Sequence, residues 1–217
     1  MCGIFGVISS REVSPLILDG LRKLEYRGYD SAGLATIQHL KNNQFGELFT
    51  RKSQGKLINL SNLINKKPIK GHLGIGHTRW ATHGKPNKKN AHPHLDFSGQ
   101  IAVVQNGIIE NYRDLYTSLQ LKEIQCTSET DTEIIPHLIG LEIENLLDNG
   151  LTPNGKTLLN AVQKVLTLLE GTYSIAVIWS KTPDALVVAR RQSPLVLGLG
   201  EGEFFCASDT PALLGFT

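Results

Sequence analysis

Cysteine occupies position 2 of the chain, directly after the initiator methionine. Because cysteine is small, we expect Met1 to be removed, which leaves Cys2 with both a thiol and a free α-amine. In model peptides the thiol titrates near ~8.5 and the α-amine near ~7.7–8.0, so part of the amine is unprotonated at neutral pH and can accept the thiol proton. One residue would then hold nucleophile and base. The position alone also allows a buried cysteine without a catalytic role.

An Asn-Gly pair, Asn106-Gly107, follows the apolar run 101–104. Such a pair is most often a hairpin turn. At a strand end it can instead present a side-chain amide and an unhindered backbone N–H to one point. That geometry suits the oxyanion of an acyl-transfer intermediate, and one such donor contributes about 3–4 kcal/mol in the transition state. Both interpretations are open from the pair alone.

Polar residues crowd the segment 76–84, which reads Gly-His-Thr-Arg-Trp-Ala-Thr-His-Gly. The planar fork of Arg79 suits a carboxylate, although a surface ion pair is the simpler alternative. His77 and His83, and likewise His92 and His94, lack helical i,i+4 spacing and an obvious acidic partner. No metal site is therefore predicted.

The run Thr130-Asp131-Thr132-Glu133 has the pattern of a capping box, which predicts a helix that opens here and continues through Leu141. An acid in the first turn interacts favourably with the helix dipole, and this alone explains Asp131. The same carboxylate is also suited to a substrate ammonium group.

The elements that must position these residues follow from hydrophobic spacing. Strands are predicted at 3–9, 33–38, 45–51, 72–77, 101–104, 173–179, 185–189, 195–199 and 204–206. Helices are predicted from Ser14-Pro15 to about Glu25, within 53–70, from the capping box, and over 158–169. The long segment 80–98 is typical of an active-site lid. Hairpin-length connections favour an α+β fold with largely antiparallel sheets and helical layers, in one domain.

Composition describes an ordinary globular protein. There are 22 basic and 20 acidic residues, so the net charge of +2 selects neither nucleic acid nor an anionic membrane. Three cysteines do not form a disulfide framework and indicate a reducing compartment. No apolar run approaches the roughly 18 residues of a membrane span. We expect a cytoplasmic protein.

Five motifs occur in a fixed order along nearly the whole chain: Cys2-Gly-Ile-Phe-Gly, the segment 24–33, His77-Thr-Arg-Trp-Ala-Thr-His-Gly84, Asn106-Gly-Ile-Ile-Glu-Asn111 and Ser128-Glu-Thr-Asp-Thr-Glu133. Together they resemble the glutaminase domain of the glutamine–fructose-6-phosphate aminotransferase (isomerizing), or glucosamine-6-phosphate synthase, family. These are class II glutamine amidotransferases of the N-terminal-nucleophile hydrolase superfamily. The Tyr26-Arg-Gly-Tyr-Asp-Ser-Ala-Gly33 part points to the sugar-phosphate branch.

The resemblance implies an αββα sandwich in which residues 2–217 form the glutaminase domain, with L-glutamine as substrate and no cofactor. It makes Cys2 the nucleophile, and the Asn106 side chain with the Gly107 N–H the oxyanion hole. It assigns substrate binding to Arg79 for the α-carboxylate, Asp131 for the α-amine, the pocket residues Trp80, Thr82 and His83, and Arg27 as a support near Cys2. The segment after Trp80 resembles the loop that closes over glutamine in this family.

The chain departs from the family pattern in two places. Gln105 stands where many relatives have histidine. The sequence also stops at Thr217, so we expect a C-terminally incomplete domain without the sugar isomerase half that binds fructose 6-phosphate in a protein expected to be a homodimer. Two alternatives remain: a glutaminase half that serves another acceptor, or a catalytically silent glutamine-binding regulatory domain.

Overall fold

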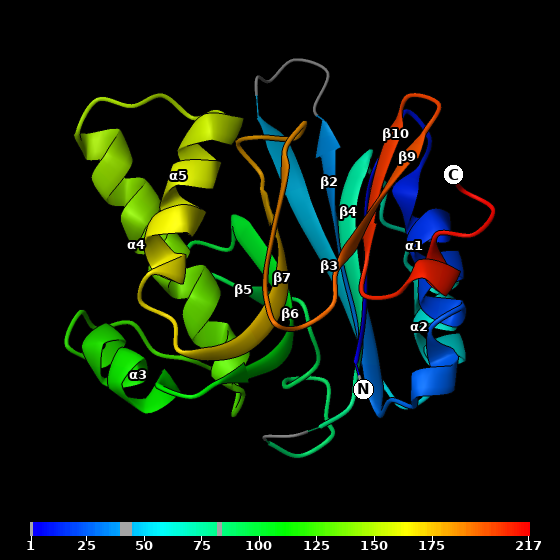
Figure 1. The fold of residues 1–217 in the computed structure, drawn as a ribbon, viewed down its shortest axis with the longest axis horizontal. Helices are drawn as coiled ribbons and strands as arrows, with labels where there is room; N and C mark the ends of the chain where they lie inside the picture. The colour runs from blue at the N-terminus through cyan, green and yellow to red at the C-terminus, as the bar shows by residue number, and fades with distance from the viewer. Residues whose placement is uncertain (1, 40–44, 82–83) are drawn as a thin grey trace.

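The structure is a computed structural model that describes residues 2–39, 45–81 and 84–217. Two antiparallel sheets lie face to face, with helices on the outer face of each (Figure 1). The α+β sandwich expected from the sequence is confirmed. The described residues form five α-helices, one more than the four that the sequence predicts.

The first sheet has six strands in the order β3-β2-β4-β1-β10-β9. Their bounds are β1 Gly3–Ile8, β2 Ser31–His39, β3 Gly46–Gln54, β4 Leu73–Arg79, β9 Val196–Gly200 and β10 Glu203–Ala207. The central strand β1 pairs with β4 on one side and with β10 on the other. The strand after Cys2 is therefore held from both sides.

The second sheet has four strands in the order β5-β6-β7-β8. Their bounds are β5 His94–Leu95, β6 Ile101–Ile109, β7 Gly171–Trp179 and β8 Leu186–Arg191. Strand β6 is nine residues long and continues through the Asn-Gly pair, whereas the apolar pattern predicted an end at residue 104. The hairpin-turn interpretation of Asn106-Gly107 is wrong.

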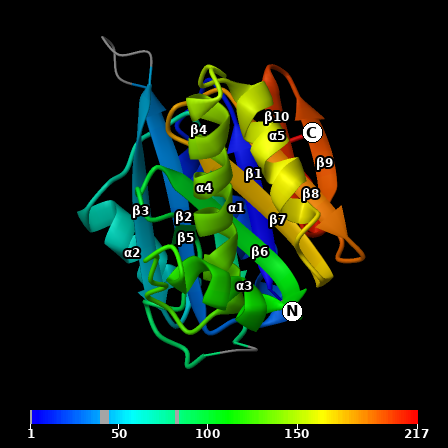
Figure 2. The same cartoon turned by 90° about the vertical axis from the view of Figure 1, so that its left-hand side faces the viewer.

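The helices form the two outer layers (Figure 1), and Figure 2 looks directly onto one of these layers. They are α1 Val13–Arg22 and α2 Leu57–Lys66 on the first sheet, and α3 Tyr112–Gln120, α4 Ile134–Asp148 and α5 Gly155–Leu166 on the second. Helix α1 ends before Glu25, where a short 3₁₀ helix, Glu25–Arg27, follows. Helix α3 was not predicted, although Tyr112, Leu115, Tyr116 and Leu119 have helical spacing and pack on the core.

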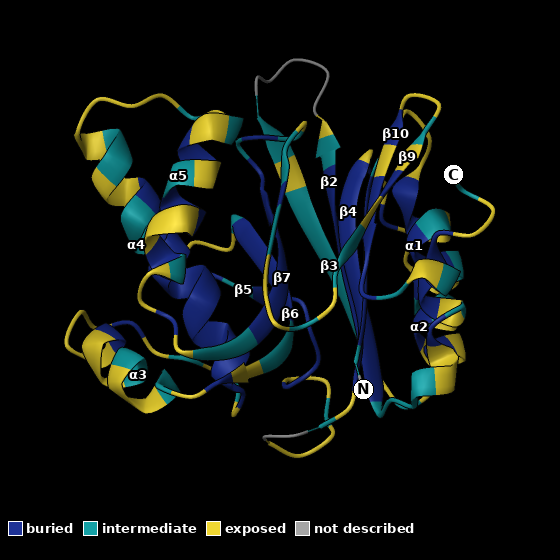
Figure 3. Cartoon of the chain, viewed as in Figure 1, coloured by how far each residue is buried: buried dark blue, intermediate teal, exposed yellow. Residues whose placement is uncertain are grey.

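Three apolar clusters correspond to the three interfaces between these four layers. One lies under α1 and α2, one under α3–α5, and the third lies between the sheets, with Ile4, Ile75 and Val104 among its members. Figure 3 shows the buried strands between the partly exposed helices. Among the described residues, no helix combines the length and apolar character needed to cross a bilayer.

Candidate functional site

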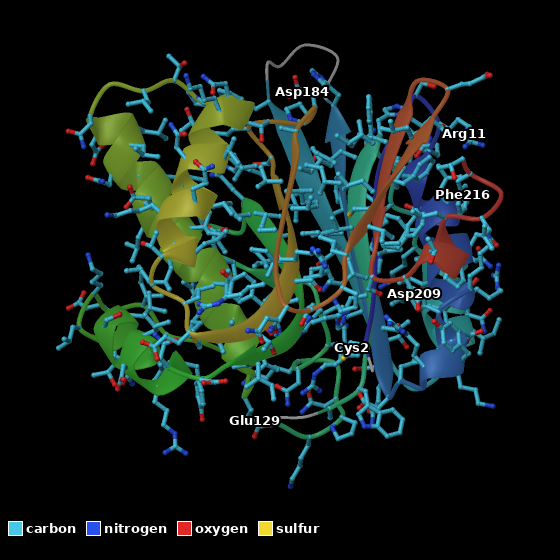
Figure 4. All side chains as sticks on the ribbon, in the orientation of Figure 1. Cys2, Arg11, Glu129, Asp184, Asp209 and Phe216 are labelled. Atoms are coloured by element: carbon cyan, nitrogen blue, oxygen red, sulfur yellow. The ribbon has the colours of Figure 1, made fainter. Side chains whose placement is uncertain are left out.

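A cavity of about 360 Å³ opens at the end of the sandwich where β1 begins. Figure 4 places Cys2 at this end of the molecule. The predicted site residues that the structure describes all line it: Cys2, Arg27, Arg79, Trp80, Asn106, Gly107 and Asp131. The predicted residues Thr82 and His83 lie outside the described residues. Segments far apart in the sequence thus meet at one cavity.

The thiol of Cys2 lies against the backbone of Trp80. The Trp80 N–H donates to Sγ at 3.1 Å, and Sγ lies 3.6 Å from the Trp80 carbonyl oxygen. Burial raises the pKa of the Cys2 thiol, while the hydrogen bond from Trp80 opposes that rise. The thiol is therefore protonated at neutral pH, and its use as a nucleophile requires a base.

The carbonyl group of Cys2 is held by two side chains. Asn106 donates to it from Nδ2 at 3.1 Å, and Arg27 donates from Nη1 at 3.2 Å. Arg27 also donates to the Ser208 hydroxyl at 2.8 Å and lies 3.4 Å from the Asp209 carboxylate. Ser208 and Asp209, which follow β10 directly, thus fix the residue that supports Cys2.

Gly107 continues β6 with a φ of +118°. A Cβ atom at this position would lie 2.0 Å from the carbonyl oxygen of Thr172 on β7. Only glycine fits this close approach of two strands. The Asn-Gly pair is therefore a feature of the strand that leaves the Gly107 backbone open beside the cavity.

Arg79 ends β4 and is buried, and its Nη2 lies 3.5 Å from the Gly84 carbonyl oxygen. The next residue, Trp80, is half exposed, and its ring lies over Gly28, where an added Cβ would come within 2.9 Å of the ring. The end of β4 thus places the Arg79 guanidinium beside the cavity. The next residue, Trp80, supplies the backbone N–H that contacts the Cys2 thiol.

Asp131 lies in a 3₁₀ helix, Asp131–Glu133, that precedes α4. Its Oδ2 accepts a hydrogen bond from the Ile109 N–H at 2.8 Å, so the carboxylate is joined to the end of β6. This contact places the acid beside the cavity.

The helix predicted from the capping-box pattern is present, but the capping box itself is not formed. The side chain of Thr130 caps no backbone N–H, and α4 begins at Ile134 and continues to Asp148, beyond the predicted end. The Glu133 carboxylate instead accepts from the N–H groups of Thr127 and Ser128 at 2.8 and 2.5 Å. These hydrogen bonds, with His137 nearby, hold the pKa of Glu133 well below its usual range, although burial opposes them.

Three histidines near the cavity are buried, with their rings in contact. The rings of His77 and His92 lie 4.2 Å apart at 20°, and those of His92 and His94 lie 4.8 Å apart. Burial lowers the pKa of His77 to about 3 and lowers those of His92 and His94 well below the usual value. Within the described residues, no group of three or more His, Cys, Asp or Glu side chains could hold a metal ion.

The predicted lid segment is attached to the loop before Asp131. Asn90 donates to the Glu129 carboxylate at 2.8 Å and accepts from the Glu129 N–H at 2.9 Å. The segment also contains β5, which the sequence did not indicate. Its movement over a substrate stays a prediction.

Several residues around the site were not singled out from the sequence. Thr172, Ser193 and Pro194 line the cavity from β7 and from the segment after β8. Ser208 and Asp209 lie behind Arg27. A Ser-Asp pair after a strand is a detectable signal, but nothing in the sequence connects it to Arg27, which is 181 positions from Ser208.

Comparisons with known proteins show which family the chain belongs to. A family model described as a glutamine amidotransferase domain matches residues 77–215. A protein of Thermosynechococcus vestitus named glutamine–fructose-6-phosphate aminotransferase (isomerizing) is 54% identical over 217 residues, which is 100% of this chain and 33% of that protein. A protein of the same name from Nostoc sp. is 48% identical with the same coverage. The chain thus spans about a third of the length of these relatives.

The fold has solved counterparts. Glutamine phosphoribosylpyrophosphate amidotransferase from B. subtilis superimposes with a TM-score of 0.78 and 25% identity, over 98% of this chain and 43% of that one. The superposition takes in nearly all of the four layers described above. Because the family model covers well over half of the sequence, the chain belongs to the glutamine amidotransferase domain family.

Proposed function

We propose that this chain hydrolyses L-glutamine to glutamate and ammonia through a thioester on Cys2. One observation carries the proposal: a thiol, an amide donor, a guanidinium and a carboxylate from separate segments line a single cavity. A nucleophile, an oxyanion donor and two groups of opposite charge are what recognition and cleavage of an α-amino acid amide require.

The charged groups assign the two ends of the substrate. Arg79 binds the α-carboxylate by its planar fork, and Asp131 binds the α-ammonium. Thr82, His83 and the backbone around Trp80 complete the pocket, and Arg27 supports Cys2 through its carbonyl group. Recognition of both α-groups explains why glutamine would be chosen over a simple amide.

The chemistry begins when the α-amine of mature Cys2 accepts the thiol proton. This base is needed because burial raises the pKa of the thiol, and the buried imidazole of His77 is already bonded to Asn106. Sulfur then attacks the side-chain amide carbon, and the oxygen takes the negative charge beside Asn106 Nδ2 and the Gly107 N–H.

Collapse of this intermediate breaks the carbon–nitrogen bond. The α-ammonium of Cys2 returns its proton to the leaving nitrogen, and ammonia departs. A water molecule then gives its proton to the same amine and attacks the thioester. The carbon–sulfur bond breaks, the sulfur regains a proton, and glutamate leaves.

The test combines the mature N-terminus with the nucleophile. Mass spectrometry should show that Met1 is absent, and Cys2→Ala should abolish ammonia release while glutamine binding stays measurable by calorimetry. Cys126→Ala is a matched control because this half-buried cysteine lies outside the cavity. A retained Met1 in active protein, or unchanged ammonia release by Cys2→Ala, would exclude the mechanism.

We further propose that residues 2–217 supply ammonia to a larger protein that makes glucosamine 6-phosphate from fructose 6-phosphate. The names of the relatives and their threefold greater length support this role. A sugar isomerase half would bind the acceptor, and the whole protein would be a homodimer in the cytoplasm, where the three free cysteines stay reduced. Amino-sugar formation by the full-length protein, with no product from residues 2–217 alone, tests the assignment.

A further inference from the structure

The orientation of the Asn106 carboxamide decides whether the proposed oxyanion hole exists. An amide turned by 180° would present an oxygen where the developing oxyanion needs a donor. In the structure, Nδ2 donates to the Cys2 carbonyl oxygen at 3.1 Å, and Oδ1 lies 2.9 Å from Nε2 of His77. The Cys2 carbonyl group therefore contacts the nitrogen of the Asn106 amide, and the His77 ring contacts its oxygen.

The protonation of His77 follows from these contacts. The ring is completely buried at the end of β4, and that burial lowers its pKa to about 3, so it carries one proton at neutral pH. The Gln105 backbone also interacts with the ring, but Nδ1 has no partner at hydrogen-bonding geometry among the described residues, whereas Nε2 faces Oδ1 of Asn106, which can only accept. The proton is therefore on Nε2, where the Asn106 oxygen accepts it.

Both neighbours disfavour the reversed amide. Reversal would bring Oδ1 against the Cys2 carbonyl oxygen and Nδ2 against the His77 N–H, which places two acceptors together and two donors together. In a buried site each unmade hydrogen bond costs about 1–3 kcal/mol. In the observed orientation one Nδ2 hydrogen is used by Cys2, and the other stays available to the cavity.

The imidazole is itself held in place. His77 stacks on His92, and Nδ1 of His92 accepts from the Gln105 N–H at 3.3 Å. His92 in turn contacts the ring of His94, whose Nε2 is 2.9 Å from the Thr130 hydroxyl. This row of rings extends from Asn106 to the residue before Asp131, and it leaves the His77 ring little freedom to rotate.

We propose that His77 is a positioning residue that, by donating from Nε2 to Oδ1 of Asn106, fixes the carboxamide with its N–H groups toward Cys2 and the substrate. The inference rests on the proposed glutamine hydrolysis. His77 does not touch the substrate; it acts only through Asn106.

Two substitutions separate the hydrogen bond from the packing. His77→Phe keeps a flat ring against His92 but removes the donor, while His77→Gln keeps a donor at the place of Nε2. Because loss of one oxyanion donor costs ~10²–10³ in kcat, we expect His77→Phe to lower kcat by ~10–10²-fold with KM changed less than about twofold. His77→Gln should recover at least ~5-fold of that loss.

The double variant His77→Phe/Asn106→Ala gives the decisive comparison. If His77 acts through Asn106, the double variant hydrolyses glutamine no more slowly than Asn106→Ala alone, since the two losses are not additive. If the fold losses in kcat of the two single variants multiply in the double variant, the proposal is overturned. So would wild-type kcat in His77→Phe while Cys2→Ala is inactive. Glutamine hydrolysis by Cys2→Ala, by contrast, would exclude the proposed function itself.

A measurement without substitution guards against misfolded variants. Nitrogen-15 NMR of imidazole-labelled protein at pH 7 should show the His77 ring neutral, with the proton on Nε2. A proton on Nδ1 would overturn the assignment, because the ring would then offer Asn106 an acceptor.

Discussion

The space between the two sheets is apolar at one end and polar at the other, although the same strands build both ends. On β4, Leu73 and Ile75 belong to the apolar cluster, and the next residues of the same face are His77 and Arg79. Since side chains alternate along a strand, steps of two residues keep to one face. The change from apolar to polar therefore occurs within a single strand.

The neighbouring strands show the same change. On β6, Ala102 and Val104 precede Asn106, and on β1 Ile4 follows Cys2. The apolar half holds the sheets together by burial. The polar half contains half-buried side chains such as Asn106, whose two amide ends are both hydrogen-bonded, and these side chains border a cavity instead of a packed core. Activity and stability should therefore respond separately to substitutions in the two halves.

The largest expected effect is in the polar half. Asn106→Ala should lower kcat for glutamine by about 10²–10³-fold, because an oxyanion donor acts mainly in the transition state. Steady-state ammonia assays measure the change, with the exposed Asn65→Ala of α2 as control. A loss confined to KM would argue that Asn106 is no oxyanion donor.

The apolar half should show the opposite result. Ile75→Ala removes a fully buried side chain between the sheets and should lower the free energy of unfolding by about 2–5 kcal/mol. Urea denaturation measures this loss, and Ile75→Val should cost only about 0.5–1.5 kcal/mol. The folded fraction should keep a kcat close to wild type. A large fall in kcat would mean that the two halves are coupled.

A fall in pH should destabilise the folded protein through protonation of Glu133. The folded protein holds the pKa of this carboxyl below its unfolded value of about 4.3, so its stabilisation is present above that pH and is lost as the pH falls. Glu133→Gln should cost about 1–3 kcal/mol at pH 7. The difference in the free energy of unfolding between Glu133→Gln and wild type should shrink below about pH 4, as measured by urea titrations. A constant difference across this range would contradict the linkage.

The smallest effect concerns substrate binding. Arg79→Lys exchanges a planar fork for a point charge, so KM for glutamine should rise about tenfold while kcat changes little. Arg22→Lys, on the exposed face of α1, is the matched control. Unchanged glutamine kinetics in Arg79→Lys would count against the carboxylate role.

Much of this arrangement could be predicted. The strands at 72–77 and 101–104, the antiparallel layers and the group of seven described site residues follow from spacing and motif order. The errors lie where a tertiary contact overrides a local pattern. Glu133 matches a capping box, yet its carboxylate binds the N–H groups of Thr127 and Ser128, because the loop before the helix folds back on it.

The Asn-Gly pair shows the same limit. Local preference indicates a turn, but pairing with β7 continues the strand through Asn106 and Gly107. The roles of Arg27 and His77 also depend on contacts made over long sequence separations, with Ser208 in one case and Asn106 in the other.

The sequence by itself determined the chemical groups and the strands that carry them, because side-chain type and alternation are local properties. Only the tertiary structure decided the orientation of the Asn106 amide, the buried neutral state of His77 and the raised thiol pKa of Cys2. These depend on which groups face one another and on the exclusion of water, and both arise only when β1, β4 and β6 pack together.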